Sequence, residues 1–129
     1  MESLCQMKSK ATNWQEFASI EHLELVMSAC AAGQLRRVVF EMKDCDESEK
    51  VKVNELFADD LVRLTKLHLN YCMFKMSLDK IKETQFKDTK IPELLRLLVS
   101  IYALKELTKD STMLYETGFF GPGSATILN

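Results

Sequence analysis

The stretch from Ile91 to Gly118 constrains the fold most, because a helix there is apolar around most of its circumference. Pro92 suits the first turn of a helix, where a missing N–H costs nothing, and Thr89 is a candidate cap. Steps of three and four residues define the main apolar face, and further apolar residues widen it: Leu94, Leu97, Leu98, Ile101, Leu104 and Thr108, then Leu95, Val99, Tyr102 and Leu107. Such a helix needs neighbours on several sides, so we expect it in the middle of a helical bundle, with Leu98 and Ile101 fully buried.

An earlier helix is predicted from about Trp14 to Met42. Thr12 and Asn13 offer a cap, and Glu16 completes a capping box. Helical steps place one set of side chains on a single face: Trp14, Phe17, Ile20, Leu23, Met27, Cys30, Gln34, Val38 and Met42. Gly33 lies inside this helix among small residues that favour the close approach of another helix; a break into two shorter helices at Gly33 is the alternative.

A second long helix is predicted from about Val53 to Lys82. Its apolar residues recur with a spacing near 3.5: Val53, Phe57, Leu61, Leu64, Leu67, Tyr71, Phe74, Leu78 and Ile81. This pattern is typical of an amphipathic helix at the edge of a bundle, and it would also suit a coiled coil. The short connection over residues 85–91 indicates that this helix and the next are antiparallel neighbours.

These elements predict an all-α fold, an antiparallel helical bundle of three long helices plus the start of a fourth. Residues 1–11 carry no periodic pattern and are expected to form a flexible tail, with the bundle occupying residues 12–129. Gly118 is expected to end the third helix, and Ser124 to cap a fourth that stops after one turn. An incomplete bundle exposes apolar surface, so we expect the isolated chain to self-associate or to be marginally folded.

Charge and hydropathy exclude several classes of partner. The net charge is −2, with 17 basic and 19 acidic residues mixed along the chain, which gives no basic patch for nucleic acid. The uncharged run Leu25–Leu35 is too short to span a membrane, and Met1–Lys10 lacks the apolar core of a secretory signal. These features predict a soluble intracellular protein.

Neither the cysteines nor the acidic loop indicates a metal site. The cysteines (Cys5, Cys30, Cys45 and Cys72) form no C-x-x-C motif or disulfide pattern, and Cys30 and Cys72 are expected to be small buried hydrophobes. Asp44, Asp46 and Ser48 match three ligand positions of a calcium loop, but the required Gly and final Glu are missing.

The residue types that support side-chain catalysis are present without a recognisable arrangement. His22 and His68 have Ser19 and Thr65 three residues earlier, which excludes the Glu-x-x-His motif of di-iron bundles. We expect His22 to be solvated and His68 to be a hydrogen-bonded residue at the edge of the core.

No general base or phosphate-binding loop is indicated either. Nothing in the sequence singles out Glu93 or Glu106 as a base, and Gly121-Pro122-Gly123 is a turn that does not join a strand to a helix. The sequence therefore predicts no catalytic residue, no metal ligand and no identifiable cofactor-binding residue.

Three stretches resemble the C-terminal helical domain of peroxisomal acyl-CoA oxidases: Ile20–Met42, Leu64–Ile81 and Leu94–Ala125. The third is the most specific. Its Leu-rich helix contains Ile101-Tyr102-Ala103-Leu104, followed by Asp110 and by Tyr115-Glu116-Thr117-Gly118-Phe119, and each segment is similar to the family pattern. The resemblance covers most of residues 14–128.

The resemblance implies an oxidase that holds FAD and removes an α proton and a β hydride from a fatty acyl-CoA, passing the electrons to oxygen to give hydrogen peroxide. The family's catalytic glutamate lies before this domain, so no catalytic residue can be carried over to this chain. The family also implies a peroxisomal homodimer, or pairing with a full-length oxidase subunit. The chain ends Ile127-Leu128-Asn129 rather than Ser-Lys-Leu, so a cytoplasmic location is otherwise expected.

Two functional hypotheses follow. In the first, the chain is an apparently truncated acyl-CoA oxidase domain that supports packing and dimer formation and binds no FAD alone. In the second, it is an all-α protein-interaction module unrelated to flavin chemistry.

Overall fold

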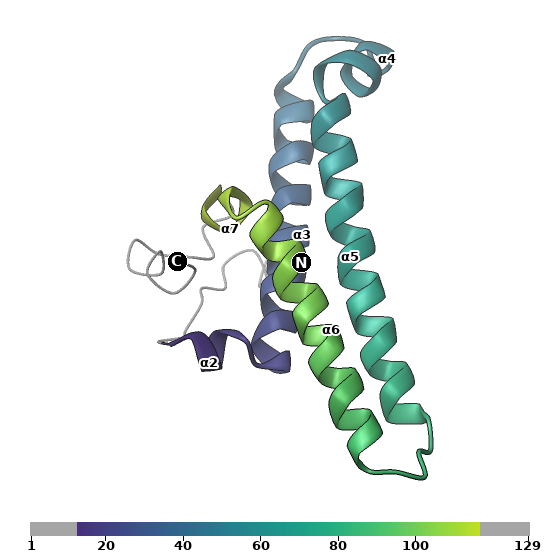
Figure 1. The fold of residues 1–129 in the computed structure, drawn as a ribbon. Coiled ribbons are helices and arrows are strands. Elements are labelled where there is room, and N and C mark those ends of the chain that lie inside the picture. Colours follow the sequence, from purple (N-terminus) through teal and green to yellow (C-terminus); the bar gives the residue numbers. More distant parts are fainter. Residues whose placement is uncertain (1–12, 117–129) are drawn as a thin grey trace.

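Three long helices make up the body of the structure, a computed structural model that describes residues 13–116. They are α3 (Ile20–Asp44), α5 (Ala58–Glu83) and α6 (Lys90–Lys109). α3 and α5 run side by side in opposite directions, and α6 packs against both (Figure 1). No strand occurs within residues 13–116, so the predicted all-α class is confirmed. The predicted tail, the Gly118 terminator and the helix start at Ser124 lie outside the described residues.

The first predicted helix is divided in two. α2 (Trp14–Phe17) is capped by Asn13, whose Oδ1 accepts a hydrogen bond from the Glu16 N–H at 2.9 Å. Ser19 then has extended backbone angles, and its Oγ accepts from the His22 N–H at 3.3 Å, so α3 begins at Ile20. The prediction of one helix from Trp14 was wrong, because the Ser19 side chain competes with the backbone for the hydrogen bonds that would continue the helix. α3 continues without a break through Gly33, so the alternative of a break there was also wrong.

The second predicted helix starts later than expected. A short turn, α4 (Glu49–Val51), leads into a π-helical segment, η1 (Lys52–Leu56). The Phe57 N–H donates to the Lys52 carbonyl, five residues back, and Phe57 has backbone angles outside the helical region. This widened turn interrupts the helix predicted from Val53, and α5 begins only at Ala58. The antiparallel arrangement of α5 and α6 is as predicted (Figure 1).

The third helix is bounded by aspartates rather than by Thr89 and Gly118. Thr89 makes no side-chain cap hydrogen bond, whereas the Asp88 carboxylate accepts from the Lys90 N–H at 2.9 Å. At the other end Asp110 leaves the helical region, and a separate short helix, α7 (Thr112–Glu116), follows. The chain therefore turns a corner near Asp110, where the sequence predicted a helix continuing to residue 118.

The core lies around α3, which contacts α2, α5, α6 and α7. Its buried members come from α2, α3, α5, α6 and α7: Phe17, Leu23, Val26, Met27, Ala29, Cys30, Phe74, Leu78, Ala103, Leu107 and Leu114. α6 contributes a buried face of Ser100, Ala103 and Leu107. Leu98 and Ile101 are each 52% exposed, so the prediction that α6 is central and buries these two residues was wrong.

Candidate functional site

An ion-pair network ties α5 to the corner between α6 and α7. The Arg63 guanidinium donates to both carboxylate oxygens of Asp110, with Nε–Oδ2 at 2.7 Å and Nη2–Oδ1 at 2.8 Å. Its Nη1 also reaches Glu116 Oε2 at 3.1 Å. Such a two-point contact fixes orientation as well as distance. The hydrogen bonds from Arg63 lower the pKa of Asp110, and the bond to Asp110 is the main cause of a raised pKa at Arg63.

Replacing Asp110 with asparagine should lower the free energy of unfolding by about 1 kcal/mol at neutral pH, since the pair is partly exposed to solvent. Because the folded state has the lower pKa, the contribution is present above the unfolded value of about 3.9 and is lost as the pH falls through the folded pKa. Urea denaturation at pH 7 and pH 3 should show the two proteins converging in acid. Asp46→Asn, in the exposed loop before α4, is the control, and an equal loss there would contradict the assignment.

Two further ion pairs join α3 to α5. Arg37 Nη2 lies 2.6 Å from Asp60 Oδ1, and Lys75 Nζ lies 2.8 Å from Glu24 Oε1. Arg37 also pairs with Glu41 one turn along α3. These charges connect one helix to another, so their geometry supports the packing of the bundle.

The two histidines lie apart and differ from what the sequence predicted. His22 is half-buried, with Nδ1 at 3.1 Å from the Phe17 carbonyl oxygen, so the prediction that it is solvated was wrong. Burial lowers the pKa of His22. His68 is exposed rather than at the edge of the core, and its Nε2 lies 3.7 Å from Cys72 Sγ. Cys72 is itself only half-buried, which corrects the prediction that it is buried; Cys30 is fully buried as expected.

Of the two candidate bases, Glu93 lies on the surface and Glu106 takes part in the packing of α6 against α5. Glu93 is exposed in the first turn of α6. Glu106 accepts hydrogen bonds from Asn70 and Lys109, and the Tyr102 hydroxyl donates to Asn70 Oδ1 at 2.9 Å. Together these groups link α6 to α5 through polar side chains. Across residues 13–116, no three His, Cys, Asp or Glu side chains gather as a metal site would require.

Membrane insertion finds no support in the described helices. Among the residues that the structure places, every helix is too short or too polar to cross a bilayer.

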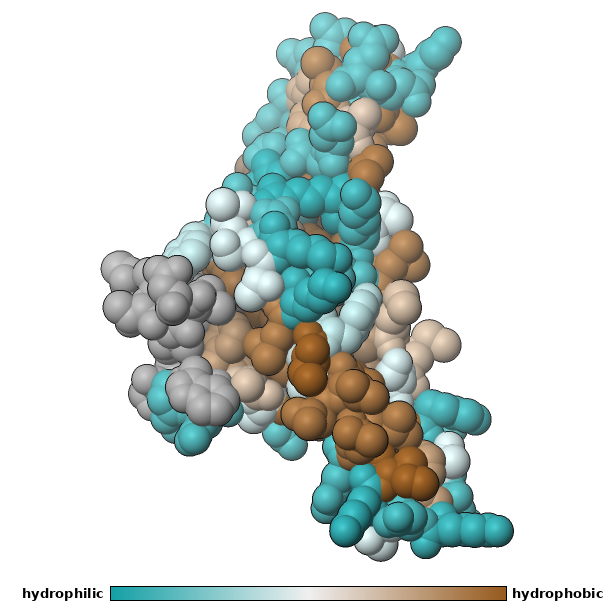
Figure 2. Space-filling model, in the orientation of Figure 1, coloured by the Kyte–Doolittle hydropathy of each residue, from teal (hydrophilic) through white to brown (hydrophobic). Residues whose placement is uncertain are grey.

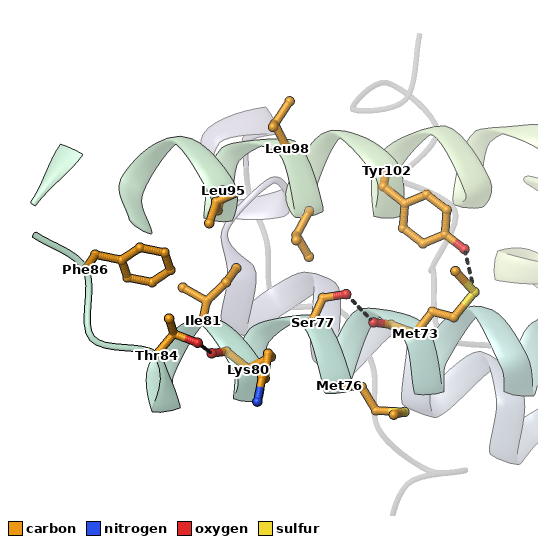
Figure 3. Close-up of a pocket in the computed structure, with 11 residues that line it drawn as sticks. Met73, Met76, Ser77, Lys80, Ile81, Thr84, Phe86, Leu95, Leu98 and Tyr102 are labelled. Atoms are coloured by element: carbon orange, nitrogen blue, oxygen red, sulfur yellow. Dashed lines mark hydrogen bonds between the residues drawn. The ribbon is translucent and has the colours of Figure 1, made fainter. Parts of the chain in front are cut away.

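An apolar groove of about 590 Å³ opens between α5 and α6 near the loop that joins them (Figure 3). Leu95 and Tyr102 point from α6 toward α5, and Ile81 and Phe86 close the end near the loop. The Tyr102 hydroxyl lies 3.9 Å from Met73 Sδ. Among the described residues that line the groove, Lys80 is the one that carries a charge, so the groove suits an apolar side chain or helix rather than a charged ligand.

The outer surface of α6 carries a row of exposed aliphatic side chains. Five of its side chains are 43–57% exposed, and we call them the α6 apolar stripe: Ile91, Leu94, Leu97, Leu98 and Ile101. Figure 2 shows this part of the molecule as a continuous hydrophobic area, and Figure 3 shows Leu98 pointing away from α5. Contiguous apolar patches of this kind mark association surfaces.

A family model described as acyl-CoA oxidase matches residues 19–129, which is most of the 129-residue chain. The chain belongs to the acyl-CoA oxidase family. The matched residues include α3, α5, α6 and α7, and they contain all three stretches in which the sequence resembled the C-terminal domain of these oxidases. Searches of curated proteins and of solved structures each returned no match.

Sequence reasoning missed both the ion-pair network and the outward orientation of the α6 apolar stripe in this acyl-CoA oxidase family member. Ser100 and Ala103 were the available signal for the orientation, because small residues one helical step apart allow two helices to approach closely. Arg63 and Asp110 are 47 residues apart, and no local pattern predicts that they pair.

Proposed function

We propose that this chain is a non-catalytic packing module of an acyl-CoA oxidase, which supports the subunit assembly around the FAD and acyl-CoA sites. The observation that carries the proposal is that the charged and the apolar side chains of the chain take different positions. The charged side chains of Arg63, Arg37 and Lys75 pair between helices, whereas the α6 apolar stripe is exposed to solvent. A surface of this composition favours contact with another protein surface.

FAD does not fit the groove that the described residues form. A flavin dinucleotide carries a pyrophosphate, which proteins hold with the N–H groups at a helix N-terminus or with clustered basic side chains. The groove between α5 and α6 is lined by apolar residues with Lys80 as its one charged member. We therefore assign FAD and fatty acyl-CoA to other parts of the oxidase. The β-oxidation role and the peroxisomal location belong to the same proposal, on family grounds.

The isolated chain should produce no hydrogen peroxide when it is mixed with FAD and palmitoyl-CoA, and it should not retain flavin after gel filtration. The physical reason is that acidic and basic side chains which do line a pocket of the described chain pair with one another, Arg63 with Asp110 and Lys109 with Glu106, and the Arg63–Asp110 pair joins α5 to the end of α6. Peroxide release coupled to fluorescence measures the activity, and absorbance near 450 nm measures flavin. Turnover by a yellow, flavin-bound chain would overturn the proposal.

A positive test uses an acyl-CoA oxidase from which the C-terminal helical domain has been removed. Addition of this chain should raise the melting temperature and the flavin retention of that enzyme core, and an unrelated helical bundle should not. If the chain has no effect on the core, the packing role is refuted.

The second candidate function is an all-α interaction module without a flavin connection. The groove between α5 and α6 favours it, because Met73 and Met76 lie at its lining and methionine side chains adapt to varied helical partners. The same core-binding experiment separates the two candidates, since an unrelated module leaves the oxidase core unchanged.

A further inference from the structure

A second apolar pocket, of about 490 Å³, lies between α3 and α5, and its volume is within the usual range for small-molecule sites. Ala31, Ala32 and Leu35 line it from α3, and Leu64 and Leu69 line it from α5. Among its described lining residues none is Asp, Glu, Lys or Arg. The two alanines are small, which leaves room between helices that pack side by side (Figure 1). The pocket therefore suits an uncharged, apolar chain.

His68 brings a chemically active group to the wall of this pocket. Ser28 Oγ and Thr65 Oγ1, which also line it, each donate to a backbone carbonyl oxygen of their own helix, at 3.0 and 2.8 Å. His68 is exposed, and its Nε2 lies 3.7 Å from the Sγ of Cys72, one turn further along α5. An imidazole and a thiol are therefore in contact beside an apolar pocket.

We propose that Cys72 is an acyl acceptor, which takes the acyl group of a thioester whose apolar chain lies in the pocket between α3 and α5. A thiol becomes a strong nucleophile when a base removes its proton, and His68 is placed to do so. The sulfur is half-buried, so a thioester carbonyl can reach it. The proposal concerns α3 and α5, and it does not rest on the packing role assigned to the α6 apolar stripe.

The reaction is an exchange between two sulfur atoms. Cys72 Sγ attacks the carbonyl carbon of the thioester while His68 Nε2, in the tautomer with hydrogen on Nδ1, accepts the thiol proton. The new sulfur–carbon bond forms, the bond from the carbonyl carbon to the original sulfur breaks, and His68 returns the proton to the departing thiolate. No atom is oxidised or reduced, so the thioester is the only reactant that the step requires.

The other cysteines of the described chain lack this combination. Cys30 is 0% exposed within the core, so its sulfur is out of reach of a thioester. Cys45, at the C-terminal end of α3, is half-buried like Cys72, but the hydrogen bonds of residues 13–116 include none between it and a histidine. Cys45 therefore serves as a reference thiol within the same molecule.

The test on the unchanged chain uses two thioesters of N-acetylcysteamine, one with a decanoyl and one with an acetyl group. Mass spectrometry of peptides measures the acylated fraction of each cysteine over time, and release by hydroxylamine identifies the thioester bond. The decanoyl group should reach Cys72 at least about tenfold faster than Cys45, and the acetyl group should show less than about a third of that preference. Equal rates at the two cysteines, or equal preference with the two reagents, would overturn the proposal.

His68→Gln tests the base, because the amide can form hydrogen bonds but cannot accept the thiol proton at neutral pH. The rate at Cys72 should fall at least about fivefold, while the rate at Cys45 in the same molecules stays constant. A loss confined to Cys72 separates proton transfer from general unfolding, and far-ultraviolet circular dichroism checks the fold. A variant that keeps the preference for Cys72 would refute the role of His68.

Leu69→Asn tests the pocket, and Val62→Asn is its matched control, since both residues lie on α5, each is 54% exposed, and Leu69 alone of the two lines the pocket. Leu69→Asn should slow decanoylation of Cys72 and leave acetylation unchanged, because only the longer chain uses the apolar wall. Equal effects of the two substitutions would contradict the pocket assignment. No flavin or oxidase enters these experiments, so their outcome is independent of the peroxide and core-binding tests.

Discussion

Replacing Phe74 with alanine should lower the free energy of unfolding by about 3–5 kcal/mol, the largest effect expected of a single core substitution in this chain. Phe74 lies on α5 with 0% of its surface exposed, in the cluster that also holds Leu23 of α3 and Ala103 of α6. Its ring therefore fills space where the three long helices meet, and neighbours that are themselves close-packed can collapse only partly into the cavity. Guanidinium denaturation followed by circular dichroism measures the change.

Leu69→Ala is the matched control, because Leu69 lies on the same helix and is 54% exposed. It should change the free energy of unfolding by well under half as much as Phe74→Ala. Similar losses in the two variants would show that α5 presents a different face to the core. The slope of the free energy of unfolding against denaturant concentration should be the same in both variants as in the unchanged chain, since the surface exposed on unfolding is nearly unchanged.

The all-α class and the antiparallel course of α5 and α6 were predictable from the sequence, since both follow from local regularities. Apolar residues recur at helical steps over α3 and α5, and a short connection leads to α6. The helix boundaries were less predictable. Ser19 ends one helix and starts another with hydrogen bonds from its own side chain, and Phe57 closes a widened turn. At both positions a local hydrogen bond replaces the regular helical one, and the spacing of hydrophobic residues does not predict such replacements.

The candidate site was predictable only in part. The resemblance to acyl-CoA oxidases identified the family, because it rests on stretches of sequence that stay together along the chain. The contacts that hold the helices in place depend instead on the tertiary arrangement. Arg63 meets Asp110 from another helix, and Lys75 meets Glu24, so each pair exists only after the helices have packed. Several other carboxylates were equally available to these cations in the sequence.

The orientation of α6 shows why periodicity was insufficient there. Leu94, Leu95, Leu97, Leu98 and Val99 surround most of the helix, so hydrophobic spacing does not distinguish an inner face from an outer one. Side-chain volume offers the explanation, because α6 contacts α3 and its buried face includes the small residues Ser100 and Ala103, which allow close packing. The larger aliphatic residues then remain outside as the α6 apolar stripe.

Replacing Ala103 with leucine should therefore lower the free energy of unfolding by about 1–3 kcal/mol, because the added carbons have no space in a close-packed contact. Ala103 is 0% exposed at the centre of the buried face of α6. Leu98→Ala should cost about 1 kcal/mol or less, since Leu98 is 52% exposed and its truncation leaves no enclosed cavity. Urea denaturation followed by circular dichroism measures both effects. The opposite ranking, with about 2–5 kcal/mol lost in Leu98→Ala and little in Ala103→Leu, would mean that the leucines of α6 face the core.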